Sequence, residues 1–107
     1  MWHGWAPVET ADEYRKHYET DIAGHLNEVA GFRGARLLSR EDSGEVEFTS
    51  IIYFEDMDVI RRFFGEQLGF GDELDRCDVA EEAQQVLSRW DDKVTYHEVA
   101  VDVPDLR

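Results

Sequence analysis

Residues 1–6 predict a short strand, with Trp2, Gly4 and Ala6 on one face and His3 and Trp5 on the other. From residue 10 to residue 29 the apolar positions instead recur at spacings of three and four, as on one face of an α-helix. This stripe consists of Tyr14, Tyr18, Ile22, Leu26 and Val29. Thr10 and Glu13 have the spacing of a capping box, so we expect the helix to begin just after Thr10.

The next two segments predict a β-hairpin. Residues 32–40 and 45–54 are joined by Glu-Asp-Ser-Gly, a typical turn sequence, and the second segment alternates with a period of two. The far half of that segment is apolar on both faces, with Ile51 and Tyr53 on one side and Ile52 and Phe54 on the other. This pattern is typical of a central strand that is covered on both sides.

The remaining pattern predicts a second helix, a long loop, a third helix and a closing strand. Asp56 is a suitable N-cap for the second helix, whose apolar stripe is Val59, Ile60, Phe63 and Phe64. Residues 65–78 are rich in glycine and acidic residues and predict a long loop. A short third helix follows, with the stripe Ala83, Val86, Leu87 and Trp90. Residues 93–103 predict the closing strand, with His97, Val99, Val101 and Val103 on one face.

The order of these elements is that of a ferredoxin-like split βαβ fold, an α+β class with a four-stranded antiparallel sheet and helices on one face. We expect residues 1–107 to form one such domain, because a chain of this length has room for one core. Apolar positions occur on both faces of the strands, and no further segment is left to cover the second face. We therefore expect a homodimer in which a second copy covers the sheet.

Composition narrows the possible partners. The formal net charge of −14 argues against nucleic acid and anionic membranes as partners. No apolar run is long enough to span a membrane and the first residues do not have the pattern of a signal peptide, so a cytoplasmic location is expected.

Nine arginines accompany only two lysines, Lys16 and Lys93, and we interpret the scattered surface carboxylates as an adaptation to a salt-rich cytoplasm. Cys77 is the only cysteine, which excludes an internal disulfide and a cysteine-based zinc site.

Four stretches carry a family resemblance. They are WHGW at residues 2–5, AGFRGA at 30–35, FTSIIYFED at 48–56 followed by IRRFFG at 60–65, and LSRWD at 87–91 followed by VTYHEV at 94–99. Over nearly its whole length the chain resembles the dimeric α+β barrel proteins known as antibiotic biosynthesis monooxygenase domains.

This resemblance implies a dimeric α+β barrel and a reaction that needs no cofactor, the oxygenation of a small aromatic or lipophilic molecule. The chain departs from the family pattern at two places. It has Phe54 where relatives usually have Trp, and its pair Tyr96-His97 stands where relatives commonly read His-Tyr. The haem-degrading branch is disfavoured, because neither its Asn nor its Trp has a match here. A non-catalytic binding or stress-related module of the same fold is the alternative, and a purely structural homodimer is a third.

The residues that we predict for proton transfer or substrate orientation are His25, Tyr53 and His97. His25 falls on the helical stripe that faces the sheet, although a histidine hydrogen-bonded at the edge of the core would follow the same pattern. His3 and His97 approach one another if the opening and closing strands are neighbours; simple strand packing is the other interpretation of both.

For ligand binding we predict an aromatic pocket between the helices and the sheet. Its candidate residues are Tyr14, Tyr18, Phe63 and Trp90, together with Tyr53 and Phe64. The same side chains would also serve to fill a small core. No phosphate-binding loop, no nucleophile elbow and no histidine spacing of a metal site is present, so neither a metal nor another cofactor is expected.

Overall fold

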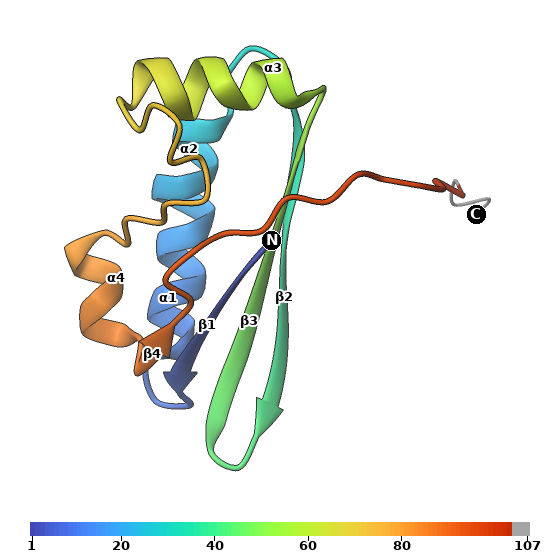
Figure 1. Cartoon of the computed structure of the whole chain (residues 1–107). Helices are drawn as coiled ribbons and strands as arrows, with labels where there is room; N and C mark the ends of the chain where they lie inside the picture. Colours follow the sequence, from blue (N-terminus) through green and yellow to red (C-terminus); the bar gives the residue numbers. More distant parts are fainter. Residues whose placement is uncertain (104–107) are drawn as a thin grey trace.

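The computed structural model describes residues 1–103 and has an α+β fold in which helices cover one face of a four-stranded antiparallel sheet (Figure 1). The strand order is β2-β3-β1-β4, as in the split βαβ pattern that the sequence predicts. The strands are β1 (Trp2–Pro7), β2 (Phe32–Asp42), β3 (Glu45–Phe54) and β4 (Arg89–Trp90). Residues 104–107 of the predicted domain lie outside the described residues.

The first helix is continuous but changes its winding in the middle. It consists of α1 (Ala11–His17), a π-helical segment η1 (Tyr18–Ile22) and α2 (Ala23–Leu26). The predicted stripe is confirmed, since Tyr14, Tyr18 and Leu26 are buried. The helix begins just after Thr10, as predicted, but the predicted capping box is wrong. The Thr10 hydroxyl makes no cap to the helix and instead donates to the Val86 carbonyl at 2.8 Å, which connects the start of this helix to α4 (Glu81–Val86).

The hairpin of β2 and β3 is confirmed, with Ser43 and Gly44 at positive φ in its turn. β3 is a central strand between β2 and β1, and its side chains alternate between two environments. Those that face the helices, among them Phe48 and Ser50, are buried. On the other face, which we call the open face of the sheet, Ile51 is half-buried and Tyr53 is exposed, so the predicted cover on both sides is not completed within one chain.

The second helix begins where the sequence predicts. The Asp56 carboxylate accepts a hydrogen bond of 3.0 Å from the amide of Val59, and the helix runs through α3 (Met57–Ile60) and η2 (Arg61–Gln67). Val59 packs directly on Gly31, which has φ +91°. A Cβ at Gly31 would lie 2.5 Å from the nearest Val59 methyl carbon, so both the backbone angle and the close approach require glycine there.

The predicted end of the chain needs correction. Trp90 lies in β4 rather than on the third helix, and β4 ends there, so the strand predicted over residues 93–103 is wrong. Asp91 and Thr95 still donate main-chain hydrogen bonds to His3 and Met1, but residues 96–103 make no main-chain hydrogen bond to the sheet. A strand needs a continuous row of such bonds, so the alternating pattern of this segment does not produce one. We call residues 96–103 the C-terminal arm; Figure 1 shows it leaving the body on the side of the sheet away from the helices.

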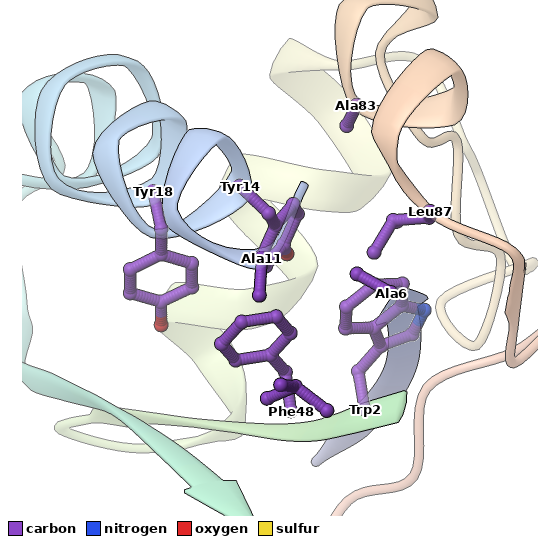
Figure 2. Packing of buried hydrophobic residues seen from close by; sticks show 9 residues of the cluster. Trp2, Ala6, Ala11, Tyr14, Tyr18, Phe48, Ala83 and Leu87 are labelled. Carbon is purple, nitrogen blue, oxygen red and sulfur yellow. The ribbon is translucent and has the colours of Figure 1, made fainter. Parts of the chain in front are cut away.

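The core lies between the first helix, α4 and the middle of the sheet (Figure 2). Phe48 of β3 is fully buried at its centre, and its ring lies 5.0 Å from that of Tyr14. The cluster is completed by Trp2, Ala6, Ala11, Tyr18, Val46, Ala83 and Leu87. Aromatic rings thus fill much of the space between the first helix and β1, and the two grooves described below lie nearer β2 and η2.

Candidate functional site

Two grooves lie between the helices and the sheet. The first, with a volume of about 440 Å³, lies between the first helix and β2, and we call it the helix–β2 groove. The second, of about 550 Å³, lies between the first helix and η2, and we call it the His25 groove. The first helix separates the two, because Tyr18, Ala23 and Asn27 line one while Ile22, His25 and Leu26 line the other.

The walls of the His25 groove are largely apolar. They come from the first helix, β3, η2 and the residue that follows η2, and consist of Ile22, Leu26, Val29, Ile52, Phe63, Phe64 and Leu68. Phe63 and Phe64 meet edge to face with their ring centroids 4.9 Å apart, and Phe64 makes a similar contact with Phe54. Such packing fixes the aromatic walls in place and leaves a surface suited to a flat apolar molecule.

His25 is the histidine that lines this groove, and an imidazole nitrogen with a free lone pair can accept a proton. Its Nδ1 lies 2.6 Å from the carbonyl oxygen of Asp21, one turn earlier in the same helix. Because a carbonyl oxygen only accepts hydrogen bonds, Nδ1 carries the proton in the neutral ring, and the lone pair is on Nε2. His25 therefore lines the groove as an oriented base. The carboxylates of Glu28 and Asp78 are also part of the lining, which disfavours an anionic ligand.

The helix–β2 groove has a different chemistry. The hydroxyl of Tyr18 forms a buried hydrogen bond of 2.8 Å with the hydroxyl of Ser50, beneath the ring of Phe48 that lines the groove. Burial raises the pKa of Tyr18, only partly opposed by this hydrogen bond, so the phenol stays protonated at neutral pH. Tyr18 can orient a polar group of a ligand but does not act as a base there.

The three residues predicted for proton transfer do not come together. His25 lines a groove, Tyr53 lies on the open face of the sheet, and His97 lies on the exposed C-terminal arm with its Nε2 2.8 Å from the Thr95 hydroxyl. His97 does not meet His3, whose partner is Asp91. Within one chain these three side chains therefore do not share a site; of the three, His25 lines a groove, and the roles of all three stay predictions.

The predicted aromatic pocket is likewise divided. Phe63 lines the His25 groove and Tyr18 lines the helix–β2 groove. Tyr14 is only 2% exposed and belongs to the core, where burial, followed by the nearby Tyr18 and Cys77, raises its pKa. Trp90 packs against the same core from β4. For these last two residues the core-filling interpretation is the one that the structure supports.

Sequence reasoning missed the pairing of His3 with Asp91. On the open face, Oδ2 of Asp91 lies 2.8 Å from Nδ1 of His3 and also accepts a hydrogen bond of 3.0 Å from the His3 amide. The Trp5 ring stacks beside His3, and the guanidinium of Arg89 lies 4.2 Å from the centre of a Trp5 ring. The antiparallel register of β1 and β4, which opposes Trp5 to Arg89, also brings residue 91 opposite residue 3. A strand assigned to residues 89–90 would have revealed this pair.

Cys77 is not an activated thiol. Its side chain packs against the core, and burial, followed by the charges of Asp78 and Asp91, raises its pKa to about 11. A thiol with this pKa carries almost no thiolate at neutral pH and is a poor nucleophile.

Within residues 1–103, no three His, Cys, Asp or Glu side chains are grouped closely enough to hold a metal ion. The helices of this part of the chain are also too short or too polar for any of them to cross a membrane. Comparisons with protein-family models, with curated proteins and with solved structures gave no match to this chain. Its membership of the antibiotic biosynthesis monooxygenase family stays a prediction that rests on the four sequence stretches.

Proposed function

We propose that this protein is a cofactor-independent, monooxygenase-like enzyme that binds a small aromatic or lipophilic molecule in the His25 groove. The observation that carries the proposal is the state of His25, whose Nδ1 is engaged by the Asp21 carbonyl so that the lone pair is on Nε2. This oriented base lines a groove whose other walls are mostly aliphatic and aromatic. A base beside an apolar surface is what the deprotonation of a weakly acidic aromatic substrate requires.

The reaction needs only the substrate, dioxygen and the base. Nε2 of His25 takes a proton from an anthrone or a hydroquinone, and the resulting anion is electron-rich enough to reduce dioxygen. For an anthrone, the ring CH₂ becomes a carbonyl, one oxygen atom of O₂ enters that carbonyl and the other leaves as water. The four electrons that the CH₂ loses are those that reduce O₂, and His25 returns its proton to the departing water. The rings of Phe63 and Phe64 would hold the flat substrate against the base.

The proposal includes a homodimer formed through the open face of the sheet. Trp5 and Ile51 lie on this face half-buried, while Tyr53 is 36% and Leu38 is 50% exposed. Side chains of this kind are usually removed from water in a stable domain. A second copy of the same face would cover them, and a symmetric pair of identical patches is the commonest way in which such surfaces are buried.

The test is oxygen consumption with a panel of anthrones and hydroquinones. We expect turnover by the native chain and a loss of about 10²- to 10⁴-fold in His25→Ala, which is the usual contribution of a general base. His97→Ala is the matched control, because His97 lines neither groove, and it should retain the native rate. Equal rates in native protein and His25→Ala, measured above the uncatalysed background, would refute the role of His25.

A non-catalytic small-molecule-binding module is the second candidate. Two observations favour it. His25 is exposed, and neither Tyr53 nor His97, the other residues predicted for proton transfer, lies in the same groove. Binding of the same panel, followed by the quenching of tryptophan fluorescence, distinguishes the two. Saturable binding that Phe63→Ala weakens, without oxygen uptake by any variant, would support the binding module and reject the enzyme.

A further inference from the structure

We propose that the His25 groove takes an aromatic molecule that carries a protonated amine on a short side chain, and that Glu28 is the residue that receives this amine. The inference rests on the proposed function, because it names the class of substrate for the same groove. It starts from the charges that line the groove and from the way in which the first helix ends there. Both make one end of a largely apolar groove negative.

Apart from His25, the ionisable groups that line this groove are carboxylates. Glu28 and Asp78 contribute them, and no lysine or arginine is among the described residues of the lining. The helix–β2 groove differs, because its lining combines Arg15 with Glu19 and so contains charge of both signs. A cleft that has one sign of charge and walls of low dielectric concentrates ligands of the opposite sign. The charge of the His25 groove therefore favours a cation.

The two carboxylates of the groove are not equivalent. Both oxygens of Asp78 are engaged by Arg76, whose Nε lies 3.0 Å from Oδ1 and whose Nη2 lies 2.9 Å from Oδ2. The guanidinium of Arg76 also lies over the ring of Phe70, 4.7 Å from its centre. Glu28, in contrast, forms no ion pair with any residue from 1 to 103. Glu28 is thus the carboxylate whose charge is available to a ligand.

The first helix ends beside Glu28. Its helical winding stops at Leu26, and the amide of Glu28 donates a hydrogen bond of 3.2 Å to the carbonyl of His25 in a final tight turn. The last main-chain carbonyls of a helix carry a partial negative charge, which attracts cations. The Glu28 carboxylate and the end of the helix therefore act with the same sign at the same end of the groove.

The rest of the groove is suited to the aromatic part of such a ligand. Phe63 and Phe64 of η2 and Ile52 of β3 give it apolar walls. His25 and Glu28 are separated by one tight turn, which is about 6 Å along the helix axis. A ring held against Nε2 of His25 would therefore bring a short side chain, such as an aminoethyl group, within reach of Glu28.

The charge of the whole chain acts in the same direction but does not select a groove. A net charge of −14 attracts cations to every part of the surface within about a Debye length. The preference of one groove for an ammonium group must instead come from the carboxylate that lines it. The proposal therefore predicts a preference that depends on Glu28 and not on the total charge.

The first test measures binding with naphthalenes, which do not react with oxygen under these conditions. The three probes carry an aminoethyl, a hydroxyethyl or a carboxymethyl group and are cationic, neutral and anionic at about pH 7. Titration calorimetry at about 0.1 M KCl gives their Kd values. The aminoethyl probe should bind about fivefold more tightly than the hydroxyethyl probe, as for one partly exposed ion pair, and the carboxymethyl probe should bind most weakly. Equal affinities for the first two probes, or no binding of the aminoethyl probe, would overturn the proposal.

The same probes locate the preference within the molecule. Glu28→Gln should lower the fivefold ratio to less than about twofold and leave the affinity for the hydroxyethyl probe unchanged. Glu66→Gln is the matched control, because Glu66 lies on η2 but lines neither groove, and this variant has the same net charge as Glu28→Gln. It should keep the native ratio, and circular dichroism verifies that both variants are folded. A ratio that stays fivefold in Glu28→Gln, or that falls equally in Glu66→Gln, would overturn the role of Glu28.

The second test separates this inference from the proposed reaction. Oxygen uptake is measured with hydroquinones that carry the same three side chains, and the uncatalysed rate is subtracted. A higher kcat/KM for the aminoethyl compound, which Glu28→Gln abolishes, is expected. If uptake depends on His25 but is the same for all three side chains, the cationic substrate is overturned and the enzyme stands. If the naphthalenes bind with the ammonium preference but no variant consumes oxygen, the specificity of the groove stands and the enzyme is rejected.

Discussion

The hydrogen bond between Tyr18 and Ser50 allows a stringent test of the packing beneath the helix–β2 groove. The two hydroxyls are 2.8 Å apart, and each residue is 6% exposed. Tyr18→Phe keeps the ring in place but leaves the Ser50 hydroxyl buried without its partner, and Ser50→Ala does the same to the Tyr18 hydroxyl. A buried hydroxyl that loses its partner costs about 1–3 kcal/mol. In a domain of this size, a loss of about 2 kcal/mol lowers Tm by about 8–16 °C.

The double variant Tyr18→Phe with Ser50→Ala should cost much less than the sum of the two single variants, because it leaves neither hydroxyl buried alone. Urea unfolding followed by circular dichroism gives the three free energies of unfolding, all measured at one fixed protein concentration so that the proposed dimerisation does not affect the comparison. Tyr14→Phe is the matched control, since the Tyr14 hydroxyl has no hydrogen-bond partner among the described residues, and it should change stability by less than about 0.5 kcal/mol. The reasoning would be refuted if the effects of the two single variants simply added in the double variant. It would also be refuted if neither single variant cost more stability than Tyr14→Phe.

Two further predictions concern Cys77 and the response to salt. With its pKa raised from 9.0 to about 11, the Cys77 thiol should react with iodoacetamide at pH 8 about 100-fold more slowly in the folded than in the urea-unfolded protein; equal rates would contradict its burial. Because the unfolded chain gives up this proton first, Cys77 should also make stability fall as pH rises from about 9 to about 11, and Cys77→Ser should remove that part of the slope. The net charge of −14 predicts that the unfolding midpoint rises between low salt and molar KCl as repulsion is screened, and a midpoint that does not change would reject adaptation to a salt-rich cytoplasm.

The sequence by itself determined the local structure of the first two helices and of the β2–β3 hairpin, and which face of each is buried. The spacing of Tyr14, Tyr18 and Leu26 located the buried side of the first helix, and the period of two in residues 45–54 located the buried side of β3. Asp56 marked the beginning of the second helix. These predictions hold because they depend on the geometry of one segment, in which side chains repeat every 3.6 or every two residues whatever the rest of the chain does. The sequence also showed that the strands have apolar residues on both faces, more than the helices of one chain can cover.

Tertiary structure alone decided which distant residues meet. β4 ends at Trp90 and residues 96–103 make no main-chain hydrogen bond to the sheet, which the alternating pattern of residues 93–103 does not predict. The same pairing brings Asp91 to His3 across 88 positions of sequence. His25 and Tyr53 lie apart because the sheet stands between the first helix and the open face, whereas His25 and Phe63 come to one groove because two helices pack side by side on β3. A site built from residues far apart in the sequence depends on how distant segments pack together. The residue pattern of one segment does not specify that packing.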